Sequence, residues 1–380
     1  MKSNPGNPIE ILSVRPQFFV EDQEIDRLAA DLLNVSVEET NAGGSRCEAI
    51  FANWGSVGGA ADFIYFDRKI LDFGKRFSVR AGAKETGIEI FTGRITAIEA
   101  RYPDSRPPEI MVLAEDGLQD LRRTRRTRTF EEIDDRNLIQ LIAGEHGLPA
   151  DVDVDGPVHR ALAQVNRSDL DFLRARVQAI DAELWFEAGA LHAQARSRRN
   201  AGAVTLAYGE KLRHFAVTAD LAEQCSLLTV SGWDVNAKES IASEASEAAI
   251  LAELDGAQSG SSVLANALGP RIESVVDLVP HSQEEAGTLA EAQYRMRARR
   301  FLTGRGVCEG DGRLRVGTHL TLQGLGGLFN GTYYVTQVVH SFTNQDGFVT
   351  QFSVEGPGLG KEIKSDAAAT KISFRPGQQR

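Results

Sequence analysis

The sequence is short of the features that mark several common classes of protein. Its three cysteines, Cys47, Cys225 and Cys308, are far apart and odd in number, so they predict neither a disulfide framework nor a paired-cysteine metal site. No stretch approaches the roughly 20 uninterrupted apolar residues of a membrane-spanning helix. Residues 1–10 lack an apolar core of signal-peptide length, so we expect no Sec-type export. These absences favour folding in a reducing cytoplasm.

The chain also lacks the positive charge that nucleic-acid binding needs. Its formal net charge is −11 at pH 7, whereas phosphate backbones are bound by net or clustered basic surfaces. One basic run, residues 122–128, mixes arginine with threonine and ends near Phe130. This pattern is typical of a strand whose charged side chains face solvent, a lumen or the acids of a neighbouring subunit. We therefore expect no nucleic acid among the partners.

What is present is the composition of a multidomain globular protein. The 380 residues are 42% hydrophobic and 25% charged, which fits two or three domains with ample cores. In the N-terminal part, alternating segments are separated by turn residues, and the longest, residues 87–99, is interrupted by Gly93. A glycine inside such a strand is typical of a bend in a barrel. Residues 1–125 are therefore predicted to form a closed or strongly curved antiparallel sheet.

The hydrophobic period changes in residues 126–200, which predicts a mixed α and β segment. Helical spacing over residues 133–146 predicts a short helix. A second helix is predicted over residues 168–180 with Ser168 as its N-cap. It leads into a hairpin predicted over residues 183–195 with its turn at Gly189.

Strands resume after residue 201 and predict a second β domain over residues 201–356. Its strands include residues 226–234, and its last strands close the domain. Within it, the Ala/Ser-rich residues 238–270 are predicted to form an exposed insertion or a weakly ordered connection. A helix is predicted over residues 283–303, and residues 357–380 form a polar tail.

The candidates for chemistry are weak. The aspartates of residues 151–155 resemble the start of a calcium loop, but its twelfth position is Leu162 and not a glutamate. Glu145–His146 lacks the second histidine of a zinc-binding helix, so His146 is predicted to be a helix-end residue. Glu183 and Glu187 flank Trp185 and could cleave glycosidic bonds, but such acids are more often solvent-facing partners of a buried ring. The sequence therefore predicts no catalytic residue, no cofactor and no metal, and leaves a cell-wall hydrolase as an alternative.

Three stretches resemble one family. Residues 164–174, followed by residues 182–186, resemble the core of phage late control protein D and of VgrG-type spike proteins. Residues 231–234 are similar to the Gly-Trp-Asp that ends a barrel strand in those proteins, and residues 331–352 resemble their closing hairpin. The matching positions are Arg167, Ser168, Asp169, Phe172, Leu173, Trp185, Phe186, Gly232, Trp233, Asp234, Tyr333, Val335, His340, Gly347, Phe348, Thr350 and Phe352.

The resemblance implies a fold and a role. The implied fold is mainly β (α+β), with two tube-protein-like antiparallel β-barrel domains, helical and hairpin insertions, and a trimeric ring of pseudo-sixfold symmetry. The implied role is a non-enzymatic baseplate hub that joins the hexameric inner tube to the trimeric spike of a contractile injection machine. Because little sequence follows the second predicted barrel, the spike is expected to be a separate chain.

The implied partners are further copies of the chain, the inner tube, the spike and other baseplate proteins, such as a LysM-containing tube-hub protein. No membrane insertion is implied, and assembly is expected in the bacterial cytoplasm, as part of a phage tail, a tailocin or an extracellular injection system. Within the matching positions, Asp169 is expected to cap its helix or to place a negative charge at the helix start, Phe172 and Leu173 to pack the helix, and Trp185 to fill a domain core. A receptor- or glycan-binding tail protein is a further alternative, although residues 238–270 hold no large aromatic residue.

Overall fold

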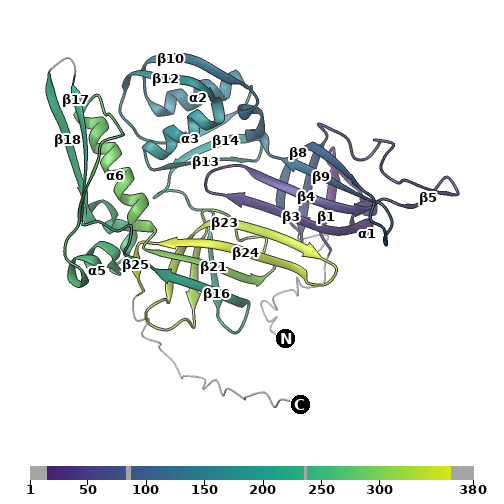
Figure 1. Ribbon diagram of the computed structural model, residues 1–380. Coiled ribbons are helices and arrows are strands. Elements are labelled where there is room, and N and C mark those ends of the chain that lie inside the picture. The colour runs from purple at the N-terminus through teal and green to yellow at the C-terminus, as the bar shows by residue number, and fades with distance from the viewer. Residues whose placement is uncertain (1–14, 83–86, 235–237, 361–380) are drawn as a thin grey trace, which may run out of the picture.

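The computed structural model describes residues 15–82, 87–234 and 238–360, and it is mainly β, with 49% strand and 20% helix (Figure 1). Buried residues form four hydrophobic cores, which divide the chain into four modules. We call them the first β module (residues 17–115), the α+β module (117–195), the second β module (203–219 and 302–359) and the inserted module (224–300). None of the helices in the described ranges combines the length and the apolar character that crossing a bilayer requires.

The first β module is an antiparallel sheet around a core of aromatic rings. Its elements are β1 (Gln17–Val20), β2 (Gln23–Glu24), α1 (Asp26–Asp31), β3 (Leu32–Thr40), β4 (Ser45–Ala52), β5 (Gly55–Val57), β6 (Ala60–Asp62), β7 (Arg76–Ala81), β8 (Ile88–Arg101) and β9 (Glu109–Glu115). The ring of Phe18 lies 5.2 Å from that of Phe51 and 5.8 Å from that of Phe77, centroid to centroid. Gly93 lets β8 approach β9, because a Cβ there would lie 2.3 Å from the carbonyl oxygen of Glu115.

In the α+β module two helices lie between a two-stranded ribbon and a three-stranded sheet (Figure 1). Its elements are η2 (Gly117–Arg122), β10 (Arg125–Ile133), α2 (Asp135–Glu145), β11 (Ala150–Asp153), β12 (His159–Ser168), α3 (Asp169–Ala179), β13 (Ala182–Glu187) and β14 (Ala190–Ala195). The predicted helices and hairpin are present, and Ser168 caps α3 by accepting the amide of Asp171 at 3.1 Å. The module begins before residue 126, because Leu118 and Leu121 are buried in its core.

The second β module contains β15 (Ala203–Ala207), β16 (Leu212–Ala219), β21 (Leu302–Glu309), β22 (His319–Gln323), β23 (Gly331–Thr343), β24 (Gly347–Gly356) and β25 (Gly358–Leu359). Strand β3 of the first module pairs antiparallel with β23, with Asn34 opposite Thr343 and Thr40 opposite Gln337. Through this pairing the strands of both modules, except β5, β6 and β25, form one 13-stranded sheet. Its described path runs from β16 to β2 and has two ends, so the two closed barrels stay a prediction.

The inserted module corrects three predictions. Its elements are β17 (Leu227–Asp234), β18 (Glu239–Ser246), η3 (Glu247–Ile250), α4 (Leu251–Leu254), β19 (Gln258–Ser259), α5 (Gly260–Ala267), β20 (Ile272–Val275) and α6 (Gln283–Arg299). Residues 238–270 are ordered structure and not a weakly ordered connection, because small residues let Ile241, Leu254 and Leu264 reach buried positions. Residues 226–234 belong to a separate sheet of β18, β17 and β20. Helix α6 ends at Arg299 and not at residue 303, because Leu302 already pairs with Gly356.

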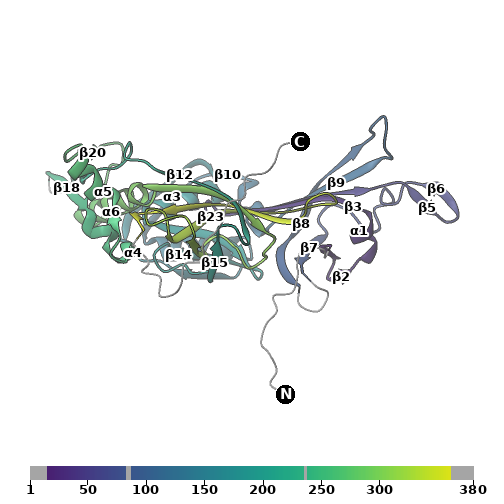
Figure 2. The same cartoon turned by 90° about the horizontal axis from the view of Figure 1, so that it is seen from below.

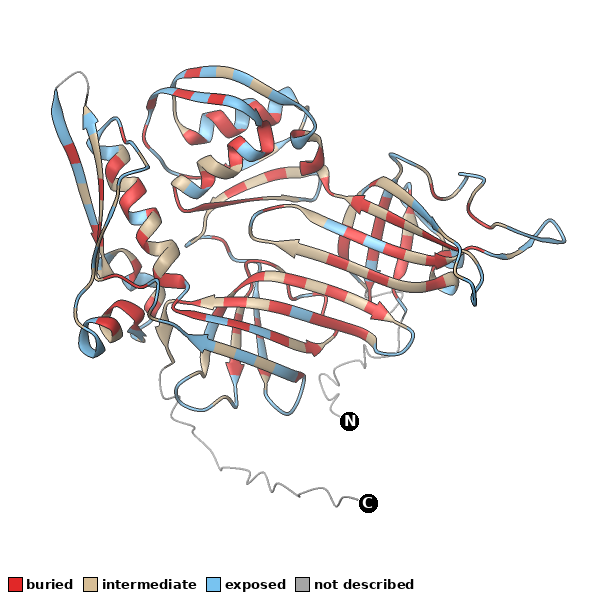
Figure 3. Ribbon diagram, in the orientation of Figure 1, coloured by how far each residue is buried: buried red, intermediate tan, exposed pale blue. Residues whose placement is uncertain are grey.

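Burial alternates along the strands of both β modules, with buried positions facing the cores (Figure 3). The predicted polar tail falls largely on residues 361–380, and the stretch in which we expect no signal peptide falls on residues 1–14. Both lie outside the described residues.

Candidate functional site

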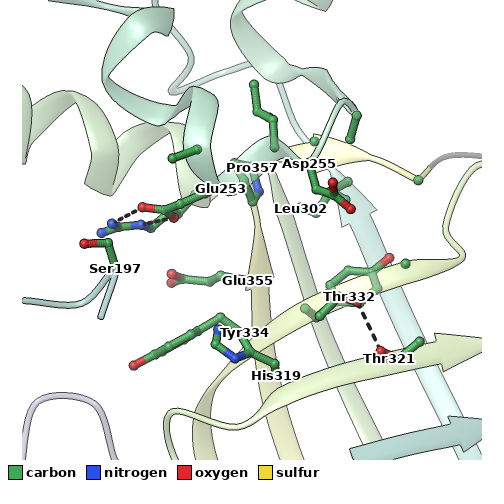
Figure 4. A pocket seen from close by; sticks show the side chains of 18 of the residues that line it. Ser197, Glu253, Asp255, Leu302, His319, Thr321, Thr332, Tyr334, Glu355 and Pro357 are labelled. Carbon is green, nitrogen blue, oxygen red and sulfur yellow. Dashed lines mark hydrogen bonds and ion pairs between the residues drawn. The ribbon is translucent and has the colours of Figure 1, made fainter. Parts of the chain in front are cut away.

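Arginine and carboxylate side chains from all four modules meet at one junction. A cleft of about 500 Å³ lies beside it (Figure 4). The cleft is bounded by α4 of the inserted module and by β21 to β24 of the second β module, with Arg196, Arg299 and Glu355 in its wall. The strands and helices that carry these residues are far apart in the sequence. The junction is therefore the place where the relative positions of the modules are fixed.

Arg299, the last residue of α6, is the most buried charge of the junction, with 2% of its surface exposed. Its guanidinium donates to Asp181 at 2.8 Å and to Glu253 at 2.7 Å. Burial opposes the charge of Arg299, but the two carboxylates more than offset this and raise its pKa. Burial likewise disfavours the charge of Glu253, yet Arg299 holds the pKa of that carboxyl below its ordinary value. The pair with Asp181 joins the inserted module to the end of α3, whereas the pair with Glu253 lies within the inserted module.

Glu183 corrects the prediction that it faces solvent. It is buried, and it accepts hydrogen bonds from Arg199 at 2.8 Å and from the Tyr334 hydroxyl at 2.5 Å. Burial, followed by the negative charge of Glu183, raises the pKa of Tyr334. The side chain points inward because β13 lies against the second β module, which supplies Tyr334. Glu187 is exposed and accepts from the indole of Trp185 at 3.3 Å.

We predicted that Trp185 fills a domain core, and this prediction is wrong. The ring lies half-buried between two modules. The guanidinium of Arg199 stands 4.1 Å above its ring centroid, and His192 stacks on it with 5.2 Å between centroids. Arg199 also donates to the carbonyl of Val316 at 3.2 Å. The ring is therefore a platform that positions Arg199 between the α+β module and the second β module.

The first β module is held by the same network. Glu39 at the end of β3 accepts from Arg315 at 2.7 Å, and the amide of Asn41 donates to the carbonyl of Thr336 at 2.9 Å. Arg196 binds Glu355 at 2.9 Å. The sequence analysis missed these arginines and most of their partners, because Arg299 and Asp181, for example, are 118 residues apart and no local pattern links them.

Asp169 does more than begin its helix. Its buried carboxylate accepts from Arg128 at 2.9 Å and from Gln164 at 2.9 Å, and it lies 2.8 Å from Nε2 of His146. Burial raises the pKa of Asp169, but His146, Gln164 and the nearby arginines lower it further than burial raises it. His146 ends α2, as predicted.

The basic run is largely exposed to solvent, one of the predicted alternatives, and several of its arginines also pair with acids of their own chain. Arg126 and Arg128 both bind Glu145 at 2.7 Å, and Arg122 binds Glu115 at 2.5 Å. Since α2 lies directly against the ribbon of β10, it brings Glu145 to the arginines. Arg167 is exposed on β12, opposite Arg126.

The acidic residues 151–155 are also paired within the chain. Arg198 binds Asp155 at 2.7 Å and Asp153 at 3.1 Å, and His192 lies 3.4 Å from Asp151. In the ranges that the structure describes, no group of three or more His, Cys, Asp or Glu residues could hold a metal ion.

The other matching positions pack, with one exception. Phe172 stacks on Phe130 at 5.8 Å, and Leu173 is fully buried. Phe186 is half-buried against the same core. In the closing hairpin the buried positions are Tyr333, Val335, His340, Phe348, Thr350 and Phe352, and Gly347 forms the turn with a positive φ. The exception is Trp233, which is 51% exposed.

The prediction that the Gly-Trp-Asp segment ends a barrel strand is wrong. The segment ends β17 of the inserted module at Asp234. A Cβ at Gly232 would lie 2.5 Å from the carbonyl oxygen of Pro280, so only glycine fits there. The segment therefore holds the loop before α6 close to β17 and turns Trp233 toward solvent.

His340 of β23 is buried without a charged partner in hydrogen-bond contact. Its Nδ1 lies 3.0 Å from the Thr350 hydroxyl, and its ring stacks on Phe348. Burial, with the charge of Arg315 adding to it, lowers the pKa of His340 to about 3. This histidine is therefore neutral in the folded protein at neutral pH.

A family model described as the Alg8 N-terminal domain matches residues 22–344. The chain belongs to this family. No curated protein matches the sequence.

Solved structures share the fold of this family member. A 43 kDa prophage tail protein from Shewanella oneidensis is 12% identical with a TM-score of 0.65, over 90% of this chain and 98% of its own. A tail protein from Neisseria meningitidis is 11% identical with a TM-score of 0.64, over 91% and 97%. A type VI secretion component from E. coli is 13% identical with a TM-score of 0.53, over 91% and 76%. At these identities the likeness shows the fold alone.

Replacing Arg299 tests the junction. Arg299→Met removes the main partner of buried Asp181 and of half-buried Glu253, so we expect the free energy of unfolding at pH 7 to fall by about 3 kcal/mol. Because Arg299 lowers the pKa of Glu253, the stability that this pair contributes is present above the ordinary value of 4.5 and is lost as the pH falls through the lowered pKa. The difference between wild type and variant should therefore shrink in acid. Urea unfolding of both proteins at pH 7 and in acid measures this difference in the free energy of unfolding.

The matched control for this test is Arg300→Met. Arg300 follows on the same helix end but is exposed, and its carboxylate contacts are 3.9 Å long. We expect its effect to stay within about 0.5 kcal/mol. Equal losses for the two variants would show that the buried pairs have no special role.

The lowered pKa of buried His340 predicts that the folded protein loses stability in mild acid. An unfolded histidine binds a proton below its ordinary pKa of 6.5, whereas buried His340 does so only near pH 3. The unfolded state therefore binds more protons between these values, and the folded state loses about 2 kcal/mol from this group between pH 7 and pH 5. In urea unfolding, His340→Gln should remove this contribution, whereas the exposed His214→Gln should not. An unchanged pH dependence in His340→Gln would refute the assignment.

Proposed function

We propose that this chain is a structural baseplate hub of a contractile injection machine, which joins the inner tube to the spike. The observation that carries the proposal is the match of the described fold to two tail proteins over nearly their whole lengths. The type VI component is itself described as structurally similar to the T4 bacteriophage tail proteins gp27 and gp5. The finer resemblance to phage late control protein D, which implies a trimeric ring of paired barrels, belongs to the same proposal.

The junction fits a role in transmitting force. One sheet runs through both β modules, a hydrogen bond from Tyr334 to Glu183 connects it to the α+β module, and the buried pair of Arg299 and Asp181 connects the α+β module to the inserted module. Continuous strand pairing and buried charge pairs resist relative movement, because any shift would break hydrogen bonds or leave charges unpaired. A protein that transmits force between a tube and a spike needs such a rigid connection.

We further propose that the chain has no enzymatic activity. The hydrolase alternative depended on Glu183 and Glu187, but Glu183 is buried and paired with Arg199, whereas Glu187 is exposed. A glycan cannot approach Glu183 while Tyr334 and Arg199 cover it.

Reconstitution tests the hub. The purified chain, mixed with the inner-tube protein and the spike protein of the same system, should form one complex that contains all three. Light scattering after size-exclusion chromatography gives its mass. A chain that stays monomeric and binds neither protein would contradict the proposal.

Peptidoglycan release tests the enzyme alternative. Wild type and Glu183→Gln, both checked for folding by circular dichroism, should release no more soluble peptidoglycan than buffer does. Release by wild type that Glu183→Gln abolishes would establish a hydrolase instead.

A further inference from the structure

The inserted module forms one end of the elongated molecule, beside the α+β module (Figures 1 and 2). Its two chain connections to the second β module lie next to each other, because the amide of Asp220 donates to the carbonyl of Phe301 at 2.9 Å. Strand β25 continues from Gly356, the partner of Leu302, and pairs with β19 of the inserted module. The inserted module is therefore tied to the second β module at one place, where α6 ends.

Helix α6 also contacts the α+β module at both of its ends. In its last turn Arg299 binds Asp181, and in its first turn Oε1 of Glu285 lies 3.3 Å from Nδ1 of His159 on β12. The two ends of the 17-residue helix are about 25 Å apart. Among the hydrogen bonds and ion pairs within the described ranges, the one between Glu285 and His159 alone links the first half of α6 to the α+β module.

His159 is enclosed by charged groups from three helices. It is 5% exposed, and its Nε2 lies 3.2 Å from the carboxylate of Asp135 at the start of α2. Arg176 of α3 binds the same carboxylate at 2.7 Å and lies 2.8 Å from Nε2 of His159. Glu285 of α6 approaches the other ring nitrogen, and it accepts the backbone amide of His281 at 2.8 Å.

The charges of this cluster balance only when His159 is protonated, because Asp135 and Glu285 supply two negative charges and Arg176 supplies one positive charge. Burial and Arg176 oppose protonation of His159, but the two carboxylates outweigh them and raise its pKa. Burial disfavours the charge of Glu285, yet His159 holds the pKa of that carboxyl below its ordinary value. The protonated histidine therefore carries the charge that binds the two modules together here.

Loss of this proton leaves one negative charge without compensation. Asp135 keeps both of its hydrogen bonds from Arg176, at 2.7 and 3.0 Å, so the uncompensated charge is that of Glu285. Neutral His159 can still donate one hydrogen bond to Glu285, but the attraction between opposite charges is gone. A carboxylate in such a site gains free energy by turning toward water.

We propose that the contact between His159 and Glu285 is a pH-sensitive attachment, which holds the first turn of α6 on the α+β module and releases it when His159 loses its proton. The inserted module then turns about its other end, where Arg299 keeps its charge. Because the pKa of His159 is raised, the attachment is complete below the ordinary value of 6.5 and is lost as the pH rises through the raised pKa. This inference goes beyond the proposed hub and does not depend on it.

Spin labels on two introduced cysteines measure the movement. Gln140 on α2 and Ser240 on β18 are exposed and can be replaced by cysteine, whereas the three native cysteines are buried. Double electron-electron resonance should show one distance between the labels at pH 6 and a second, longer distance at pH 9. We expect the ratio of released to attached protein to rise at least about fivefold between these pH values.

Three variants of the labelled protein identify the group responsible. His159→Gln should remove the pH dependence. Glu285→Gln keeps an acceptor for the amide of His281, and so retains the start of α6, but it should shift the change in distance to lower pH. His146→Gln is the matched control, since His146 contacts Asp169 within the α+β module, and it should respond to pH as wild type does.

Two results would overturn the proposal. One is the same single distance at both pH values in wild type, and the other is a pH response that His159→Gln leaves unchanged. The second result would assign the movement to another group, such as buried Asp116, whose pKa burial raises to about 7. If His159→Gln does not fold, Glu285→Gln decides, because an unshifted response rules out the attachment. Neither result bears on binding to tube and spike, so the hub is tested separately.

Discussion

The pairing of β3 with β23 is the constraint on which the rest of the structure depends. It turns two β modules into one sheet and brings Phe342 and Phe348 of the second into the core of the first. The register also decides which face each strand presents, since a slip of one residue would exchange the buried and exposed sides. It thereby places Glu39 opposite Arg315 and the end of β3 beside Thr336.

The charge network at the junction works by a different principle. Removing two charges from water costs nearly as much as their attraction returns, so buried pairs add little net stability. What they add is selectivity, because any other arrangement of the modules would leave Asp181, Glu183 or Arg299 buried without a partner. Strand pairing therefore holds the two β modules, and charge pairing orients the two modules attached to them.

Features encoded by neighbouring residues could be predicted from the sequence, whereas contacts between modules could not. The cap of α3 by Ser168, the turn at Gly189 and the packing of Phe172 follow from spacing along a few residues. The exposure of Trp233 and the burial of Glu183 depend on which element lies alongside, and alternation along one strand cannot tell which side that element will cover. The prediction of a weakly ordered connection over residues 238–270 was wrong for a related reason. Small side chains pack well only when larger side chains of a neighbouring element, such as α6, fill the space beside them.

The distance along the chain between β3 and β23 has a consequence for synthesis. Thr40 must wait for Gln337 to leave the ribosome before the two can pair, and at typical rates of elongation this takes about 15 to 60 seconds. During that interval the edge of β3 is open to other nascent chains. The first β module is thus completed only near the end of translation, when Phe342 and Phe348 can enter its core.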